Sequence, residues 1–215
     1  MQSPTSAHFT AALRVLRYLK QSLGQDILLS SQSTPTLTAY SDSDWGRCVD
    51  FRKSVTGYCV LLGNSPISWR TKMQSMVARS TAEAEFKAIA TTTCEVTWLL
   101  QLFIDLGLSQ LAPAQLKCDN QAALYIVSNP VFHECTEHIE VDCHLIHDKM
   151  HCGVIKPTYV PTKAQLADVC TKIVTVCQHN FLLSKLGVHD IFTSQFEGEC
   201  RKQRESAESV IISTS

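Results

Sequence analysis

Four carboxylates stand at positions where a folded chain could gather them. Asp42 and Asp119 each end an apolar run that is typical of a buried strand. Glu85 has apolar residues three and four positions further on in a helical pattern, which predicts that it faces the core. Asp168 lies in a late segment that also has helical spacing. We therefore expect these side chains to converge on one edge of the core.

Such a cluster would have a defined chemical use. Buried carboxylates repel one another and lose hydration, which is costly when nothing compensates their charge. Two Mg²⁺ ions, with Mn²⁺ as a substitute, would offset this cost, as in phosphodiester-cleaving sites that hold two metal ions. The predicted metal ligands and catalytic groups are Asp42, Glu85, Asp119 and Asp168.

Neighbouring carboxylates leave two of these assignments open. Asp44 is an alternative to Asp42, although it is better explained as a turn residue that hydrogen-bonds the backbone. Glu83 is an alternative to Glu85, although with Ser80 it fits a capping box at the start of a helix. The stretch YSDSD differs from the Tyr-x-Asp-Asp motif of polymerases because its aspartates are not adjacent.

Hydrophobic periodicity and turn signals predict the elements that position these side chains. Helices are expected at residues 6–24, 80–107, 120–127, 136–153, 162–174 and 179–187, and strands at residues 26–30, 37–41, 54–63, 66–70, 115–119 and 154–160. Pro157 favours a sheet edge or a bulge for the last strand. A strand meander followed by alternating helices and strands is an α/β layer architecture. Because ligands bind beyond the carboxyl ends of strands in such sheets, Asp42 and Asp119 are expected side by side.

The charges of the chain limit how it could bind a polyanion. Its 20 acidic and 19 basic residues give a net charge of −1, so any nucleic-acid binding must come from a local patch. In residues 47–79 the only acidic residue is Asp50, which predicts a phosphate-facing surface, although a solvated basic face explains the charge as well. The candidate nucleic-acid-binding residues are Arg47, Arg52, Lys53, Arg70, Lys72 and Arg79.

Several features favour an intracellular protein, cytoplasmic or nuclear, without a membrane partner. The first residues lack the basic and apolar regions of a secretory signal, and no apolar run is long enough to span a membrane. The 10 cysteines stand singly, without a Cys-x-x-Cys pair, which favours reduced thiols over a disulfide scaffold. A hydrophobic content of 45% with 18% charged residues is typical of a globular chain.

Four stretches carry a more specific signal: YSDSDWGRCVDFRKSVTGYCVLLGNSPISW, STAEAEFKAIA, CDNQAALYIVSNPVFHECTEHIEVDCHLI and YVPTKAQLADVCTK. In this order they closely resemble the ribonuclease H domain of copia-type LTR retrotransposon Pol polyproteins, particularly those of plants. The resemblance runs from about residue 8 to about residue 190. It implies a ribonuclease H-like α/β fold, with a mixed five-stranded sheet flanked by helices. The catalytic carboxylates of that family match Asp42, Glu85, Asp119 and Asp168.

The resemblance also implies an activity and a domain organisation. The expected activity is metal-dependent endonucleolytic hydrolysis of the RNA strand of an RNA–DNA hybrid, by a part of a larger reverse transcriptase polyprotein. Residues 1–35 correspond to the trailing end of the reverse transcriptase, a helix plus a strand, and residues 36–190 to the ribonuclease H-like domain. Residues 191–215 are expected to be a disordered tail, and the polymerase palm is absent.

Two other functions stay open at this point. The chain could be an inactive retrotransposon remnant that at most binds nucleic acid or protein, or a nuclease for DNA or structured RNA. All four carboxylates favour the enzyme, and the missing palm favours the remnant. Residues 157–167 also lack the histidine that many ribonucleases H carry in a loop before the last carboxylate. Lys163 or water would have to take its role.

Overall fold

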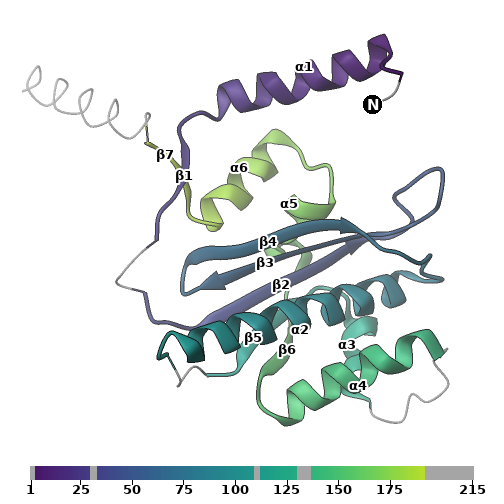
Figure 1. Ribbon diagram of the computed structural model, residues 1–215, viewed down its shortest axis with the longest axis vertical. Coiled ribbons are helices and arrows are strands. Elements are labelled where there is room, and N and C mark those ends of the chain that lie inside the picture. Colours follow the sequence, from purple (N-terminus) through teal and green to yellow (C-terminus); the bar gives the residue numbers. More distant parts are fainter. Residues whose placement is uncertain (1–2, 30–32, 109–111, 130–136, 192–215) are drawn as a thin grey trace, which may run out of the picture. The chain divides into compact units, whose positions relative to one another are not determined.

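The computed structural model describes residues 3–29, 33–108, 112–129 and 137–191 (Figure 1). The expected disordered tail therefore lies, apart from Ile191, outside the described residues. The chain divides into two compact units. One unit comprises residues 1–28 and 188–215, and the other comprises residues 29–187.

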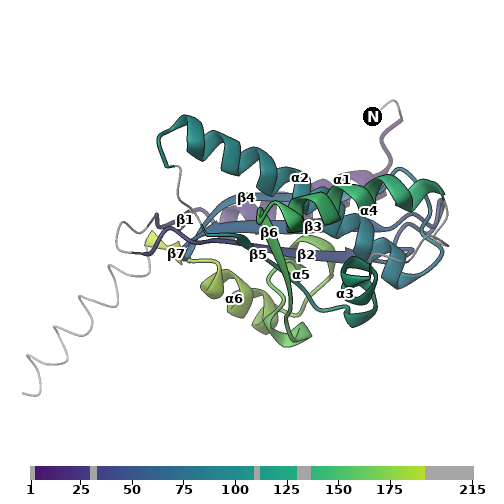
Figure 2. The same ribbon diagram turned by 90° about the horizontal axis from the view of Figure 1, so that it is seen from below.

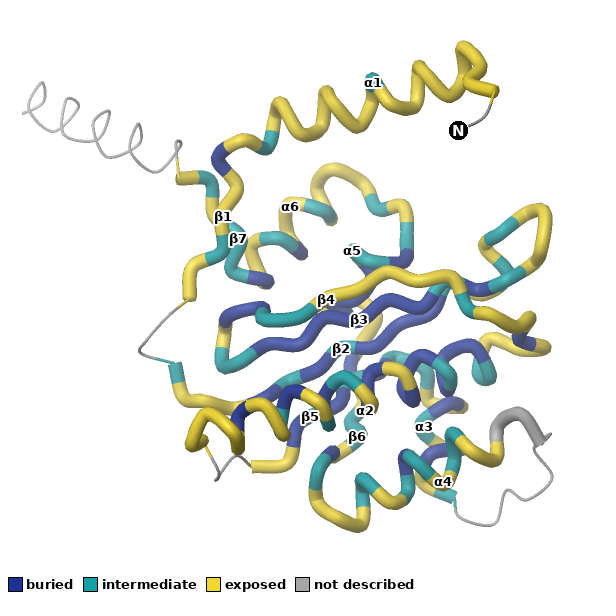
Figure 3. Tube along the Cα trace, in the orientation of Figure 1, coloured by how far each residue is buried: buried dark blue, intermediate teal, exposed yellow. Residues whose placement is uncertain are grey.

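The described residues of the smaller unit include one long helix and a two-stranded sheet. Helix α1 (Ser6–Gln21) begins at Thr5, whose hydroxyl accepts a hydrogen bond from the His8 backbone N–H. All 16 residues of α1 are described and none is buried, as Figure 3 shows. Strand β1 (Gln25–Ile27) pairs antiparallel with β7 (Val188–Asp190). Of the strand predicted at residues 26–30, Asp26 and Ile27 belong to β1, Leu28 and Leu29 do not, and residue 30 lies outside the described residues.

A mixed five-stranded sheet forms the centre of the larger unit, with the strand order β4-β3-β2-β5-β6. Its strands are β2 (Leu37–Asp44), β3 (Val55–Leu62), β4 (Ser65–Met73), β5 (Ala114–Cys118) and β6 (Ile155–Tyr159). Strands β2, β3 and β4 form the predicted antiparallel meander, whereas β5 runs parallel to β2 and β6 parallel to β5. This is the sheet of the predicted ribonuclease H-like fold. The edge position of β6 agrees with Pro157.

Helices cover both faces of this sheet. They are α2 (Thr81–Asp105), α3 (Gln121–Ser128), α4 (Glu137–His151), α5 (Asp168–Thr171) and α6 (Val176–Lys185). Helix α2 packs along one face with α4 beside it, and α5 and α6 lie on the opposite face (Figure 2). The two layers therefore bring residues from α2 and from α5 to the same central strands.

The core lies between α2 and the sheet. Phe86 and Ile89 on α2 are fully buried, as are Leu37 on β2, Val60 on β3 and Leu116 on β5. Burial extends along most of β2 and β3 (Figure 3). Removing this apolar surface from water stabilises the unit, and it fixes the positions of the polar residues at the strand ends.

The prediction of one continuous helix at residues 162–174 is wrong. The segment instead forms a 3₁₀ turn (Thr162–Ala164) and then the four-residue helix α5. Gln165 has extended backbone angles, φ −76° and ψ 104°, because its buried side-chain amide donates to the Ser41 carbonyl at 2.9 Å. The hydrogen bond to the buried Ser41 carbonyl thus contributes more at this position than a further turn of helix would. After Thr171 the backbone becomes extended again, at Lys172.

Candidate active site

Asp42 lies near the carboxyl end of β2 and is completely buried. Both of its carboxylate oxygens accept hydrogen bonds from consecutive residues at the end of α5. The Thr171 hydroxyl donates to Oδ2, and the Lys172 ammonium donates to Oδ1 at 3.0 Å. A buried carboxylate is therefore held by a hydroxyl and a positive charge, which offsets its lost hydration.

Gly57 makes this contact between α5 and the sheet sterically feasible. It lies opposite Asp42 in the antiparallel register of β2 and β3. A Cβ at position 57 would be 2.5 Å from Thr171 Cγ2 and 2.7 Å from Cys170 Cβ, both closer than real Cβ contacts. The missing side chain lets α5 approach the strand closely, which brings Asp168 beside Asp42.

Glu85 comes from the buried face of α2. Its Oε1 accepts a hydrogen bond from the Ser43 backbone N–H at 3.1 Å, which joins the helix to β2. Burial raises the pKa of Glu85 to about 9, and the negative charges of Asp42 and Asp119 contribute to this shift. Without a cation, Glu85 therefore holds a proton at neutral pH.

Asp119 directly follows β5, which is parallel to β2. The ligand atoms of Glu85, Cys118 and Asp119 all lie within 4.8 Å of one another. The Cys118 thiol lies 3.8 Å from Glu85 Oε2, to which it donates. Burial raises the pKa of Cys118, and the charge of Glu85 raises it further, so the thiol remains protonated. At this point the cluster thus offers carboxylate oxygens and a neutral thiol.

Asp168 is the first residue of α5 and is almost fully buried. Its Oδ1 accepts a hydrogen bond from Lys172 Nζ at 2.7 Å. Burial raises the pKa of Asp168, and this effect outweighs the hydrogen bond from Lys172, which lowers it. Burial alone would lower the pKa of Lys172, but the contacts with Asp168 and Asp42 raise it instead. Lys172 is therefore an ammonium ion between two carboxylates.

The structure thus brings all four predicted carboxylates together, from β2, α2, β5 and α5. The two alternatives have other partners. Asp44 forms an ion pair with Arg47 at 2.6 Å. Glu83 forms an ion pair with Lys87 at 2.7 Å, and its Oε2 accepts the Arg79 backbone N–H at 2.7 Å. Of the predicted capping box, the Ser80 hydroxyl accepts the Glu83 N–H, while the Glu83 carboxylate reaches Arg79 rather than Ser80.

Three residues that support the cluster are not among those predicted from the sequence. Thr171 and Lys172 hold Asp42, and Lys172 follows Asp168 by four residues, a spacing that could have indicated their contact. Gln74 donates to Thr56 Oγ1 at 2.9 Å and to the Ala84 carbonyl at 3.0 Å, so it ties the meander to the start of α2. No feature of the sequence around Gln74 indicates this role.

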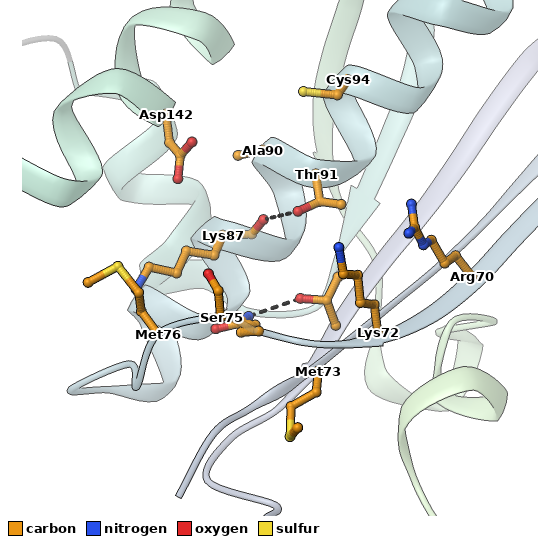
Figure 4. Close-up of a pocket in the computed structure, with 12 residues that line it drawn as sticks. Arg70, Lys72, Met73, Ser75, Met76, Lys87, Ala90, Thr91, Cys94 and Asp142 are labelled. Atoms are coloured by element: carbon orange, nitrogen blue, oxygen red, sulfur yellow. Dashed lines mark hydrogen bonds between the residues drawn. The ribbon is translucent and has the colours of Figure 1, made fainter. Parts of the chain in front are cut away.

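The predicted nucleic-acid-binding residues occupy three places. Arg47, Arg52 and Lys53 lie between β2 and β3, Arg70 and Lys72 lie on β4, and Arg79 precedes α2. Arg70 and Lys72 line a surface cavity of about 330 Å³ together with Lys87 and Asp142 (Figure 4). Among the described residues that line this cavity, none belongs to the carboxylate cluster. The cavity is therefore a separate, basic feature of the same unit.

The donor set of the cluster fits a hard divalent cation. Carboxylate oxygens are the preferred ligands of Mg²⁺. The raised pKa values of Glu85 and Asp168 arise from burial and from like charges, both of which a bound cation would relieve. The neutral Cys118 thiol is a poor ligand for Mg²⁺. The residues that would hold the metal are thus the four carboxylates.

Comparisons with known proteins relate the chain to retroelement polyproteins. It is 40% identical over 188 residues to a retrovirus-related Pol polyprotein from transposon RE1 of Arabidopsis thaliana, covering 87% of this chain and 13% of that protein. It is 34% identical over 189 residues to the corresponding polyprotein from transposon TNT 1-94 of Nicotiana tabacum, covering 88% and 14%. The chain thus spans about one seventh of the length of these relatives.

Other comparisons concern the fold and family models. Among solved structures, LC11-RNase H1, isolated from compost by a metagenomic approach, matches with a TM-score of 0.47 at 14% identity. That match covers 64% of this chain and 93% of the other. No family model matches the chain. Of the helices that the structure describes, none is long and apolar enough to cross a membrane.

Proposed function

Because the chain is homologous to a segment of retrovirus-related Pol polyproteins, we propose that it is a ribonuclease H-type endonuclease that hydrolyses the RNA strand of RNA–DNA hybrids. The observation that carries this proposal is the convergence of four carboxylates at the carboxyl ends of β2 and β5. We further propose that it acts inside the cell, in the cytoplasm or nucleus, as one part of a larger polyprotein.

The four carboxylates would hold Mg²⁺, or Mn²⁺ in its place. When bound, two such ions supply an activated water and stabilise the leaving 3′ oxygen of the cleaved phosphodiester. The protein's own groups orient the ligands. The Ser43 N–H fixes one oxygen of Glu85, and the Thr171 hydroxyl fixes one oxygen of Asp42. Glu85 must release its proton before it binds a cation, which makes metal affinity depend on pH.

The hybrid would be selected by its shape. A ribonuclease of this kind contacts 2′-hydroxyls and phosphates across the minor groove and does not need to read bases. The exposed cations Arg70 and Lys72 on β4 and Arg79 before α2 are suited to phosphate contacts. Because the net charge of the chain is −1, hybrid binding would depend on these local cations. Contacts between cations and phosphates weaken as the salt concentration increases, so we expect the affinity for the hybrid to fall with added salt.

The proposal is tested with purified protein and end-labelled substrates. We expect cleavage of the RNA strand of a hybrid with Mg²⁺, no cleavage with EDTA, and no cleavage of duplex DNA or duplex RNA. Asp119→Asn should abolish cleavage, because it removes a ligand that lies beside Glu85. Asp105→Asn, a matched change at the far end of α2, should leave cleavage intact.

Each alternative function predicts a different result. Hybrid binding without cleavage, at any concentration of Mg²⁺ or Mn²⁺, would indicate a binding module that has lost activity. Cleavage of duplex DNA or structured RNA at rates equal to those for the hybrid would indicate a nuclease of another specificity. Cleavage that survives Asp119→Asn would mean that the carboxylate cluster is not the catalytic site.

A further inference from the structure

An ammonium ion lies within the carboxylate cluster itself. Lys172 Nζ is 3.0 Å from Asp42 Oδ1 and 2.7 Å from Asp168 Oδ1. It thus connects two carboxylates that come from β2 and from α5, the first and the last of the four along the chain. The Thr171 hydroxyl occupies the other oxygen of Asp42. The end of α5 therefore supplies a hydrogen-bond donor to each oxygen of Asp42.

The surroundings distinguish these contacts from an ordinary surface ion pair. The side chains of Asp42 and Asp168 are 0% and 3% exposed, and that of Lys172 is 35% exposed. Exposed ion pairs contribute little because water competes for both partners. Here the two carboxylates have almost no contact with water, so removal of the ammonium would leave two negative charges buried side by side.

The same two oxygen atoms would be needed by a metal ion bound between Asp42 and Asp168. Mg²⁺ ligand oxygens lie about 2.0–2.1 Å from the ion. An ammonium that already contacts both oxygens fills the space between them, and its positive charge would repel a second cation. Lys172 and a metal ion therefore cannot occupy this place together.

We propose that Lys172 is an internal counter-ion that holds the Asp42–Asp168 pair in the metal-free protein and that a metal ion displaces it. This inference rests on the proposed function, since it assumes that these carboxylates bind metal. Its consequence is a trade-off: Lys172 stabilises the folded metal-free chain and weakens the binding of the cation. The side chain can leave because it is partly exposed and lies just beyond the last turn of α5.

The first experiment compares Lys172→Met with the parent protein and with Lys156→Met. Lys156 is an exposed residue on β6, so its variant carries the same charge change outside the cluster. In EDTA, Lys172→Met should melt roughly 5 °C or more below the parent, as expected when one partner of a buried pair is lost. Lys156→Met should have the same melting temperature as the parent.

The affinity for Mn²⁺, measured by electron paramagnetic resonance of the free ion, should change in the opposite direction. We expect Lys172→Met to bind Mn²⁺ about tenfold or more tightly than the parent, and Lys156→Met to bind like the parent. Mn²⁺ binding by Lys172→Met that is equal to or weaker than that of the parent would overturn the proposed displacement. Equal melting temperatures in EDTA would overturn the counter-ion role, whether or not the protein is a nuclease.

A second experiment uses the parent protein alone, so it does not depend on the folding of a variant. Acetic anhydride modifies accessible lysines, and mass spectrometry of peptides gives the extent at each. Without metal, the contacts with Asp42 and Asp168 should protect Lys172. Saturating Mn²⁺ should raise its modification severalfold while that of Lys156 stays constant. If electron paramagnetic resonance shows that Mn²⁺ is bound and the modification of Lys172 is still unchanged, the proposal that the metal ion displaces Lys172 is refuted.

Discussion

Substitution of Glu85 by glutamine should change how the stability of the metal-free protein depends on pH. Glu85 has a pKa of about 9 in the folded chain, raised first by burial and then by Asp42 and Asp119. In the unfolded chain its pKa is about 4.3. The folded parent therefore binds one more proton than the unfolded parent between these two pH values. Glutamine is neutral throughout, and its amide oxygen can still accept the Ser43 N–H.

The size of the effect follows from proton linkage. A raised carboxyl pKa contributes stability that is fully present below pH 4.3 and is lost as the pH rises through 9. The loss is about 1.4 kcal/mol per pH unit, or about 2.7 kcal/mol between pH 5 and pH 7. For a unit of this size that corresponds to roughly 5–11 °C in melting temperature. Glu85→Gln should gain this much relative to the parent over the interval.

The assay is thermal unfolding in EDTA, followed by circular dichroism at pH 5, 6 and 7. Glu83→Gln is the control on the same helix. Burial alone would raise the pKa of Glu83, but its hydrogen bonds with Lys87 and the Arg79 N–H lower it. Glu83→Gln should therefore be less stable than the parent by an amount that is nearly constant from pH 5 to pH 7, because a lowered carboxyl pKa contributes stability that is lost only as the pH falls below about 4.3. Melting temperatures of Glu85→Gln and the parent that change in parallel from pH 5 to pH 7 would refute the reasoning.

Three further predictions concern other parts of the larger unit. Gly57→Ala should lower the free energy of unfolding by about 1–3 kcal/mol and reduce cleavage, because the added Cβ pushes α5 away from the sheet. A melting temperature equal to that of the parent would contradict this prediction. Replacing Arg70 and Lys72 by alanine should lower the slope of log affinity against log salt by up to about 2 in hybrid-binding assays; the parent's slope would exclude them as phosphate contacts. Iodoacetamide at pH 7.5 should alkylate exposed Cys152 and spare buried Cys118; equal labelling of their peptides would contradict the burial.

The parts of the fold that were predictable from sequence have strong local signals. The long helix predicted at residues 80–107 is observed as α2 at Thr81–Asp105, because its apolar periodicity and the Ser80 cap agree. Pro157 favoured a sheet edge or a bulge, and β6 is indeed an edge strand. The ends of two predicted strands and the buried face of one predicted helix were enough to predict that Asp42, Asp119 and Glu85 lie close together. The catalytic roles of these residues remain predictions.

The parts that were not predictable depend on contacts between distant residues. The break in the helix expected at residues 162–174 arises from the bond between Gln165 and the carbonyl of Ser41, 124 residues earlier. The pairing of Lys172 with Asp42 has the same character, and it requires Gly57 to be small. Helical periodicity contains no information about such partners, since it indicates which face of a helix is apolar and not which residues pack against that face.

The late position of α5 has a consequence for damaged gene copies. All five strands of the sheet are complete at Tyr159, whereas Thr171 follows Asp42 by 129 residues. A stop codon shortly after residue 160 would spare the sheet and delete the fourth carboxylate, the hydroxyl and the ammonium together. Asp42 would then be left without the two donors that offset its burial. A single nonsense mutation near the end of this unit would thus remove the proposed nuclease activity and still yield a chain with every strand of the sheet.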